Sequence, residues 1–316
     1  MNRLIQVTIP DLPFEIREQL VKKYDGVVYQ SVNQLDATSK KKVEVLVSYG
    51  YDITSEMLVD YPSLKWVQIF QTGLHHLPLQ ELKKRNIVLT NVRGIYGIPI
   101  SEYVLSFILY FVRDFERYRV NKINRIYERG NLPDEAGGKT LVILGAGTIG
   151  NAIAEMGKKI GMNVVGVNTT GKIKPFFDQM YSFEQRTEAI VQGDFIVCVF
   201  PVTEKTKESI TKNELAFMKQ SAYFMNIGRA ELINEQHLIE HLHNNKIKGA
   251  VLDVFQQEPL PKTSPLWDLP NVYLTPHISG KTKNFFSRCL AYFDTNILAY
   301  KNSMPMTFVF DYDKGY

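Results

Sequence analysis

Residues 141–150 read LVILGAGTIG, four apolar residues that lead into Gly145, Gly147 and Gly150 at the spacing Gly-x-Gly-x-x-Gly. The apolar run predicts a buried strand, and residues 151–160 are compatible with a helix. Between a strand and a helix, the first glycine permits a tight turn, the second admits a pyrophosphate, and the third allows close helix packing. Free N–H groups and the helix dipole favour phosphate there. The stretch therefore predicts a dinucleotide-binding turn.

Alternating strand-like and helix-like segments extend in both directions from this turn. Strands are expected at residues 140–144, 163–168, 195–200, 223–227, 250–255 and 272–275, and upstream at 4–9, 27–29, 43–47, 65–70 and 87–89. Such alternation predicts parallel sheets covered by helices, in an α/β protein. We expect a Rossmann dinucleotide-binding domain with a doubly wound parallel sheet at residues 100–283. A smaller, flavodoxin-like substrate domain should comprise residues 1–99 and 284–316, with one long helix at 100–126 linking the two.

Length and composition agree with two soluble domains. The chain has 316 residues, of which 45% are apolar and 22% charged, and its net charge is +4. That length exceeds what one hydrophobic core usually serves. No basic run is interleaved with aromatic residues, and the longest uncharged apolar run, residues 104–112, is shorter than the roughly 20 residues of a membrane span. Two cysteines and no signal-like start suit the cytoplasm, without nucleic-acid or membrane partners.

The residue after the second Rossmann strand bears on cofactor choice. An acid is usual there, because it binds the ribose hydroxyls and repels a 2′-phosphate. Here the position holds Asn168, followed by Thr169, Lys172 and Lys174. Neutral donors beside cations favour NADP(H) slightly over NAD(H). The alternative is that the two lysines are solvated loop residues.

Three ionisable residues follow expected strands of the same sheet: Arg229, Glu258 and His277. Carboxyl ends of parallel strands share one edge, which is where open α/β sheets bind ligands. Each residue alone could be an ordinary surface residue, but together they suggest a catalytic set.

At this point the sequence resembles the D-isomer-specific 2-hydroxyacid dehydrogenases over nearly its whole length. The motifs that carry the resemblance are the glycine turn, FPVTEKT at 200–206, NIGRA at 226–230, LDVFQQEPLP at 252–261, LTPHISG at 274–280, and TNVRGIYG at 90–97 with SEY at 101–103. The resemblance implies that Arg229 binds the substrate carboxylate and polarises the carbonyl. His277 would be the general acid in reduction and the base in oxidation, with Glu258 as its partner. An imidazolium and a guanidinium suit the alkoxide that hydride transfer creates.

Further site residues are implied by family position alone. For the cofactor, they are Thr148 and Ile149 at the pyrophosphate, Pro201 and Thr206 near the adenosine, and Asp253 at the nicotinamide carboxamide. For the substrate, they are the turn Thr72, Gly73 and Leu74, whose N–H groups would hold a carboxylate, and Tyr96. Phe70, Leu74 and Tyr96 suggest an apolar pocket. His75 departs from the acid that usually follows the loop glycine.

These features predict an enzyme that transfers a hydride between NAD(P)H and a small 2-oxo or 2-hydroxy acid, with cofactor and substrate meeting between the domains. The alternative is a dinucleotide-sensing regulatory or scaffold protein on the same fold with little turnover. No lysine or arginine within residues 71–78 would grip a phosphate, although Arg93 could add charge. An unphosphorylated acid is therefore favoured.

Two further expectations concern assembly and metal. A homodimer follows from the resemblance and from the apolar helix at 100–113, whose apolar face could equally be internal. His237 and His241 lie one helical turn apart, with His243 nearby, a spacing that can bind a metal. The segment 234–245 is otherwise polar, so a solvated helix face without metal is expected.

Overall fold

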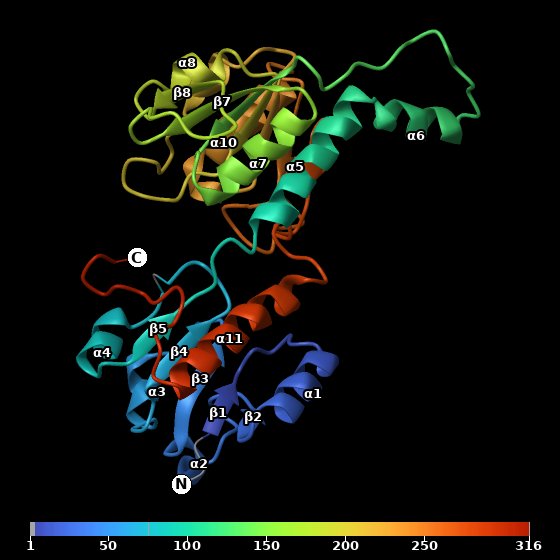
Figure 1. The fold of residues 1–316 in the computed structure, drawn as a ribbon. Helices are drawn as coiled ribbons and strands as arrows, with labels where there is room; N and C mark the ends of the chain where they lie inside the picture. The colour runs from blue at the N-terminus through green and yellow to red at the C-terminus, as the bar shows by residue number, and fades with distance from the viewer. Residues whose placement is uncertain (1–3, 75, 316) are drawn as a thin grey trace. The chain divides into compact units, whose positions relative to one another are not determined.

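The computed structural model describes residues 4–74 and 76–315, and its contacts divide the chain into two compact units. The first comprises Met1–Ile95 with Lys283–Tyr316, and the second Tyr96–Thr282. Each unit is built around its own parallel sheet with helices on both sides (Figure 1). The α/β class is confirmed.

The first unit contains a five-stranded parallel sheet in the order β2-β1-β3-β4-β5. This order, 2-1-3-4-5, is that of flavodoxin-like folds. Its strands are β1 (Leu4–Val7), β2 (Val27–Tyr29), β3 (Val43–Ser48), β4 (Trp66–Ile69) and β5 (Val88–Thr90). Its helices are α1 (Phe14–Lys23), α2 (Ala37–Lys40), α3 (Ser55–Val59), α4 (Leu79–Lys84) and the C-terminal α11 (Phe285–Lys301).

Helix α11 and the segment after it pack in the first unit, although they follow the second unit in sequence. Asn296 on α11 is fully buried, and its amide donates to Gln68 Oε1 on β4 at 3.1 Å. The Tyr312 hydroxyl donates to the Ile87 carbonyl at 2.7 Å. Buried amides and hydroxyls need such partners, so these bonds hold the C-terminal segment against the sheet.

The second unit contains a seven-stranded parallel sheet in the order β12-β11-β10-β9-β6-β7-β8. Its strands are β6 (Thr140–Leu144), β7 (Asn163–Asn168), β8 (Gln179–Ser182), β9 (Phe195–Cys198), β10 (Tyr223–Asn226), β11 (Gly249–Leu252) and β12 (Val272–Leu274). Its helices are α5 (Gly97–Val112), α6 (Phe115–Ile123), α7 (Thr148–Lys159), α8 (Arg186–Ile190), α9 (Lys212–Ala216), α10 (Glu235–His243) and the short 3₁₀ helices η1 (Ala230–Leu232) and η2 (Pro265–Asp268). Strand order reverses between β6 and β9, which makes this edge a topological switch point.

Successive side chains of β6 pack on opposite faces of this sheet, and their neighbours show which helices cover each face. Val142 and Leu144 pack in one cluster with residues of α8, α9 and α10. Leu141 and Ile143 pack in another with residues of α5 and α7. Successive strand residues point to opposite faces, so a wholly apolar strand is buried on both.

Two sequence-based expectations about this unit were wrong. Strand β8 was not predicted, because its sequence QMYS is at the sheet edge and contains no fully buried residue. The helix expected at 100–126 is two helices, since Asp114 between α5 and α6 has the left-handed φ of 54°. Such a residue cannot continue a right-handed helix, and α6 extends from α5 away from the sheet (Figure 1).

Candidate active site

The glycine turn after β6 has the geometry that its sequence suggested. Gly145 has φ 121°, and a Cβ there would lie 2.8 Å from the Val199 carbonyl carbon. A Cβ on Gly150 would lie 2.2 Å from the Gly145 oxygen. By contrast, a Cβ on Gly147 would meet nothing within 4 Å. Two of the glycines are thus required by the protein itself, whereas Gly147 faces open space.

Helix α7 begins at this turn with its first N–H groups available for a ligand. Its N-cap, Gly147, has no side-chain cap, and the Asn151 N–H donates to the Gly147 carbonyl at 2.9 Å. The N–H groups of Thr148, Ile149 and Gly150 precede that bond and have no partner within the helix. Open space over Gly147 together with these donors fits a diphosphate at a helix N-terminus.

The loop after β7 is shaped by Asn168. Its Oδ1 accepts the N–H groups of Thr170 (2.9 Å) and Gly171 (2.7 Å), and its Nδ2 donates to the Lys172 carbonyl (2.9 Å). Thr169 and Lys172 are exposed. Lys174 Nζ reaches back to the Ala146 carbonyl in the glycine turn at 2.6 Å. The asparagine therefore folds the loop, and Lys174 places one cation next to the glycine turn.

The loop after β9 is held by Thr206, which is buried. The Thr206 hydroxyl donates to the Pro201 carbonyl at 2.6 Å and accepts the Thr203 N–H at 2.8 Å. Pro201 itself is exposed. The hydroxyl of Thr206 is thus used within the chain, where it closes the turn that presents Pro201.

His277 and Glu258 lie together beyond the ends of β12 and β11. His277 Nδ1 is 2.9 Å from Glu258 Oε2, and Glu258 Oε1 accepts the Phe255 N–H at 3.0 Å. With Nδ1 directed at the carboxylate, the imidazole has Nε2 left for a substrate. Both side chains are partly exposed, at 48% for His277 and 38% for Glu258.

Arg229 follows β10, which lies beside β11 in the sheet. Its backbone is fixed by the buried Asn226, whose Nδ2 donates to the Arg229 carbonyl at 3.0 Å. The side chain is exposed, and Nη1 donates to the Gly228 carbonyl at 2.8 Å. Gln256 Nε2 donates to the Ala230 carbonyl at 3.0 Å, so the loop that carries Glu258 is tied to the loop that carries Arg229.

Asp253, directly after β11, is fully buried and holds the loop that contains His277. Its Oδ1 accepts the Thr275 hydroxyl (2.6 Å) and the Ile278 N–H (2.9 Å), and its Oδ2 accepts the Ser279 N–H (2.9 Å). The partners of the carboxylate therefore lie both before and after His277 in the sequence. One lone pair of Oδ2 is left over in this arrangement.

The expected carboxylate turn belongs to the first unit. The Thr72 hydroxyl donates to the Val92 carbonyl at 3.2 Å, and Asn91 Nδ2 donates to the Thr72 carbonyl at 2.9 Å. Thr72 is exposed and Gly73 half-buried. The suggestion that Phe70 and Leu74 line a pocket was wrong, because their side chains are 0% and 7% exposed in the core of the unit. His75 lies outside the described residues.

Tyr96 belongs to the second unit and packs beside the loop that contains His277. A Cβ on Gly280 would lie 2.7 Å from Tyr96 Cδ1, so the ring lies directly against the end of that loop. The ring is half-buried. Of the proposed substrate residues, Tyr96 and Arg229 therefore lie in the dinucleotide-binding unit, and residues 72–74 in the other.

Comparison with known proteins identifies the family. Residues 105–279, more than half of the chain, match the model of the D-isomer specific 2-hydroxyacid dehydrogenase, NAD binding domain. The chain belongs to this family. It is an NAD(P)-dependent 2-hydroxyacid dehydrogenase, and the second unit contains its NAD-binding domain.

Relatives of this dehydrogenase cover most of its length. A family member from Aeromonas salmonicida subsp. salmonicida A449, of known crystal structure, is 32% identical with a TM-score of 0.84, over 99% of this chain and 100% of that chain. Glyoxylate/hydroxypyruvate reductase B of Serratia proteamaculans is 27% identical over 87% of this chain and 88% of its own. Glyoxylate reductase of Korarchaeum cryptofilum is 28% identical over 83% of this chain and 80% of its own.

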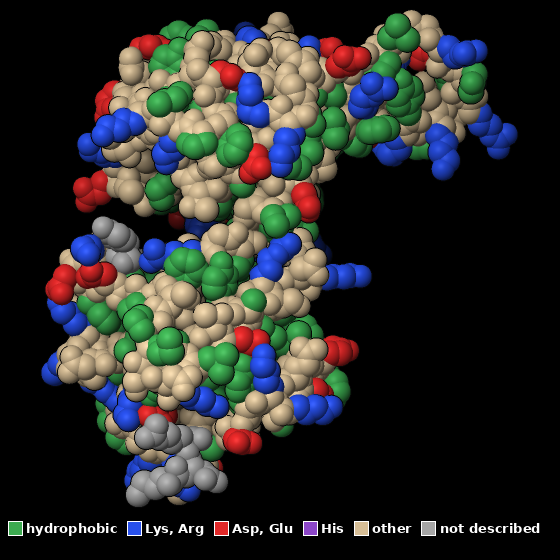
Figure 2. Space-filling model, in the orientation of Figure 1, with side chains coloured by type: hydrophobic (Ala, Val, Ile, Leu, Met, Phe, Trp, Pro, Cys, Tyr) green, Lys and Arg blue, Asp and Glu red, His purple; other side chains and the backbone are tan. Residues whose placement is uncertain are grey.

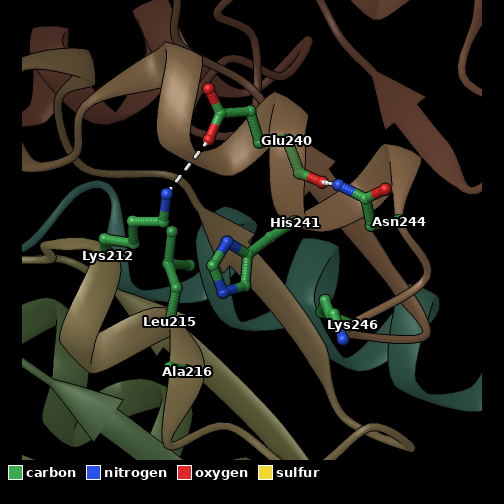
Figure 3. A pocket seen from close by; sticks show the side chains of 7 residues that line it. All are labelled: Lys212, Leu215, Ala216, Glu240, His241, Asn244 and Lys246. Atoms are coloured by element: carbon green, nitrogen blue, oxygen red, sulfur yellow. Dashed lines mark hydrogen bonds and ion pairs between the residues drawn. The ribbon is translucent and has the colours of Figure 1, made fainter.

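A pocket of about 360 Å³ lies elsewhere on the dehydrogenase, between α9 and α10 (Figure 3). His241 projects into it beside Lys212 and Glu240, which form an ion pair at 3.5 Å. The helix face of His237 and His241 was expected to be solvated, and for His241 this was wrong. It is 8% exposed, its Nδ1 lies 3.2 Å from the His237 carbonyl, and burial lowers its pKa.

Several residues that organise the candidate site had no role in the sequence-based interpretation. Asn226 fixes the turn before Arg229, and Gln256 ties the loop of Glu258 to the loop of Arg229. Thr275 and Tyr103 bond to each other, at 2.6 Å between their hydroxyl oxygens. All four residues lie inside quoted motifs, but only the fold connects Tyr103 with Thr275. Within residues 4–74 and 76–315, no helix is long and apolar enough to cross a bilayer.

Proposed function

We propose that this dehydrogenase reduces a small, unphosphorylated 2-oxo acid to the D-2-hydroxy acid, with His277, Glu258 and Arg229 as its catalytic residues. The supporting observation is the 2.9 Å contact between His277 Nδ1 and Glu258 Oε2 at the sheet edge that also carries the glycine turn. That contact leaves Nε2 as the only ring nitrogen able to exchange a proton with substrate.

His277 acts as the acid in reduction and as the base in oxidation. When bound, the nicotinamide supplies a hydride to the carbonyl carbon or accepts one from the alcohol carbon. His277 Nε2 gives its proton to the carbonyl oxygen, so that a ketone, a hydride and a proton become an alcohol. Glu258 accepts the Nδ1 proton in both states and stabilises the imidazolium. Because Phe255 holds the other carboxylate oxygen, Glu258 is oriented before substrate binds.

Arg229 binds the substrate carboxylate and stabilises negative charge on the carbonyl oxygen. A guanidinium is permanently charged and offers paired donors that match a carboxylate. Its only described side-chain bond is the one from Nη1 to the Gly228 carbonyl. Asn226 holds the Arg229 backbone, so the exposed side chain starts from a fixed position.

The cofactor is held by the glycine turn and by the loops after β7, β9 and β11. The N–H groups of Thr148, Ile149 and Gly150 would bind the diphosphate, and Gly145 and Gly147 shape its cradle. Pro201, in the turn that Thr206 closes, would line the adenosine pocket. By its place in the family pattern, Asp253 would lie near the nicotinamide carboxamide.

We propose NADP(H) as the slightly preferred cofactor. Asn168, Thr169 and Lys172 would surround the adenosine ribose. The neutral Asn168 brings no charge that would repel a 2′-phosphate, and its bonds to the following loop keep the exposed Lys172 nearby. A nearby cation favours the extra phosphate.

The substrate would be bound by Arg229, Tyr96 and the turn Thr72, Gly73 and Leu74. Because the Leu74 side chain is buried, only backbone groups of that residue are available to a ligand. The relatives from Serratia proteamaculans and Korarchaeum cryptofilum carry the names of glyoxylate and hydroxypyruvate reductases. These two acids are therefore the first substrates to test.

We also propose a homodimer that works in the cytoplasm. The apolar face of α5 is not free, since Val104, Ile108 and Phe111 are buried inside the second unit. Apolar side chains are instead exposed on α6 and the segment that follows it, where Figure 2 shows them among basic side chains: Phe115 50%, Ile123 67%, Ile126 54%, Tyr127 90% and Leu132 83%. Such a patch suits a second copy of the chain.

The proposal of a cytoplasmic protein is supported by the two cysteines. Both are buried free thiols, which suit a reducing compartment.

The direct test is oxidation of NADPH and NADH, followed by absorbance, in the presence of a panel of 2-oxo acids that starts with glyoxylate and hydroxypyruvate. The proposal requires turnover of at least one acid and, for an acid whose product is chiral, such as hydroxypyruvate, a D-configured product in chiral chromatography. An absence of turnover on every acid would instead favour a dinucleotide sensor.

A further inference from the structure

The loop that carries His277 is held by a chain of three hydrogen-bonded side chains inside the second unit. Asp253 accepts the Thr275 hydroxyl at 2.6 Å, and the Thr275 oxygen lies 2.6 Å from the Tyr103 hydroxyl. Thr275 has one hydroxyl proton, which it gives to the carboxylate, so Tyr103 must donate to Thr275. The chain runs from helix α5, through the end of β12, to the end of β11.

This chain fixes both sides of a residue with an unfavourable backbone conformation. His277 has φ 53°, in the left-handed region that a residue with a β-carbon rarely adopts. Its N–H donates to the Thr275 carbonyl at 3.0 Å, and Asp253 binds the Ile278 and Ser279 N–H groups just beyond it. Such a conformation persists only where the surroundings enforce it. Thr275 is therefore the anchor on the N-terminal side of the histidine.

Tyr103 supplies the outer end of the chain from a rigid element. Its ring packs edge-on against Phe107 at 5.0 Å between ring centroids, on the same helix. Burial raises the pKa of Tyr103, so its hydroxyl stays protonated and remains a donor. The Tyr103 bond leaves the Thr275 hydroxyl proton directed at Asp253.

We propose that Tyr103 and Thr275 are positioning residues for His277, which hold its loop through Asp253 so that Nε2 stays aligned with the substrate. The inference rests on the proposed function, since it assigns their effect to the acid and base step. Neither residue needs to touch the cofactor or the substrate. Because Asp253 keeps the Ile278 and Ser279 N–H groups as partners, loss of either positioning residue should lower kcat more than it changes the KM for the nicotinamide cofactor.

The test compares Thr275→Val, which removes the hydroxyl at nearly constant volume, with Thr275→Ser, which keeps it, and with Tyr103→Phe. Tyr273→Phe is the matched control, because Tyr273 lies on β12, two residues before Thr275, and makes no described hydrogen bond through its hydroxyl. We expect kcat to fall about 10-fold in Thr275→Val and about 3-fold in Tyr103→Phe, as the loss of one or two hydrogen bonds implies. Thr275→Ser should stay within about 3-fold of wild type, and Tyr273→Phe should be unchanged.

A second readout is the NMR signal of the His277 imidazole nitrogens, assigned with His277→Gln as reference. The signal should shift or split in Thr275→Val and Tyr103→Phe and stay unchanged in Tyr273→Phe.

The inference would be overturned if Thr275→Val and Tyr103→Phe both kept the wild-type kcat and the wild-type imidazole signals. It would also be overturned if Tyr273→Phe had an equal effect. If Thr275→Val does not fold, Tyr103→Phe decides by the same criteria. If the wild type turns over no 2-oxo acid, the proposed function has failed, and the NMR signals alone decide whether the chain positions the histidine.

Discussion

Glu258 Oε2 lies 2.9 Å from His277 Nδ1, although 19 residues separate the two in sequence. They follow adjacent parallel strands, β11 and β12, so the sheet brings them to one edge. The carboxylate selects the tautomer and the orientation of the ring, as in other pairs of an imidazole and a carboxylate.

Replacement of Glu258 by Gln should lower kcat for 2-oxo acid reduction by about 10- to 100-fold, less than loss of the acid itself. The amide cannot stabilise the imidazolium as a carboxylate does, so proton donation to the carbonyl oxygen should slow. Steady-state kinetics with a 2-oxo acid that the wild type reduces measure this. Asp268→Asn, which neutralises an exposed carboxylate on η2, is the control and should keep the wild-type kcat. A wild-type kcat in Glu258→Gln would contradict the assigned partnership.

The three glycines of the turn should respond differently to alanine. Gly150→Ala places a Cβ 2.2 Å from the Gly145 oxygen, and such overpacking should lower the free energy of unfolding by about 1–3 kcal/mol. Gly147→Ala meets no atom within 4 Å, so its stability should stay within about 0.5 kcal/mol of wild type. Its affinity for NADPH and NADH should nevertheless fall, because the methyl group enters the space proposed for the diphosphate. Urea unfolding and fluorescence titration measure the two effects, and normal cofactor affinity in Gly147→Ala would be incompatible with the proposed cradle.

Asn168→Asp should move the cofactor preference towards NADH. The aspartate can still accept the Thr170 and Gly171 N–H groups, so this part of the loop should keep its shape, whereas the bond from Nδ2 to the Lys172 carbonyl is lost. We expect the ratio of kcat/KM for NADPH to that for NADH to fall at least about 10-fold, which corresponds to about 1.4 kcal/mol. Lys172→Ala should lower kcat/KM for NADPH alone, with NADH as the internal control. A wild-type preference for NADH of tenfold or more would overturn the assignment to NADP(H).

His241 should make the stability of the protein sensitive to pH. Burial lowers its pKa in the folded state below the ordinary histidine value of about 6.5, and Lys212 acts in the same direction, whereas the His237 carbonyl and Glu240 oppose it. The unfolded chain therefore binds a proton more readily than the folded one. Stability should be highest above about pH 6.5 and decline as pH falls below it, until the folded-state pKa is passed.

The comparison of His241→Gln with wild type isolates this effect. Between pH 8 and pH 5 the variant should lose less free energy of unfolding in urea than the wild type does. His243→Gln, on the same helix but exposed, should behave like wild type. Equal losses in wild type and His241→Gln would show that His241 does not titrate with folding.

Sequence order can anticipate which candidate residues share an edge when they lie at the ends of parallel strands. Asn168 ends β7, and Arg229, Glu258 and His277 follow other strands of the same parallel sheet, whose strands share a carboxyl edge. The glycine spacing was informative for a similar reason, because close approach to β6 and β9 excludes a β-carbon at Gly145 and Gly150.

Features that depend on tertiary contacts could not be read from local pattern. Tyr103 and Thr275 are 172 residues apart, and only the packing of α5 against the sheet brings their hydroxyls together. The break at Asp114 interrupts a helical pattern that continues on both sides of it. Leu74 looked like a pocket residue, yet a turn beside a buried strand can direct an apolar side chain into the core.

The measurement that tests the assigned chemistry most directly is the single-turnover rate of NAD(P)H oxidation by a 2-oxo acid that the wild type reduces, compared between wild type and His277→Ala. The rate should fall about 10²–10⁴-fold, the usual contribution of a general acid. Affinity for NAD(P)H should be unchanged, since the glycine turn that binds it is intact. A variant that reduces the acid at the wild-type rate would contradict the role of His277 as the proton donor.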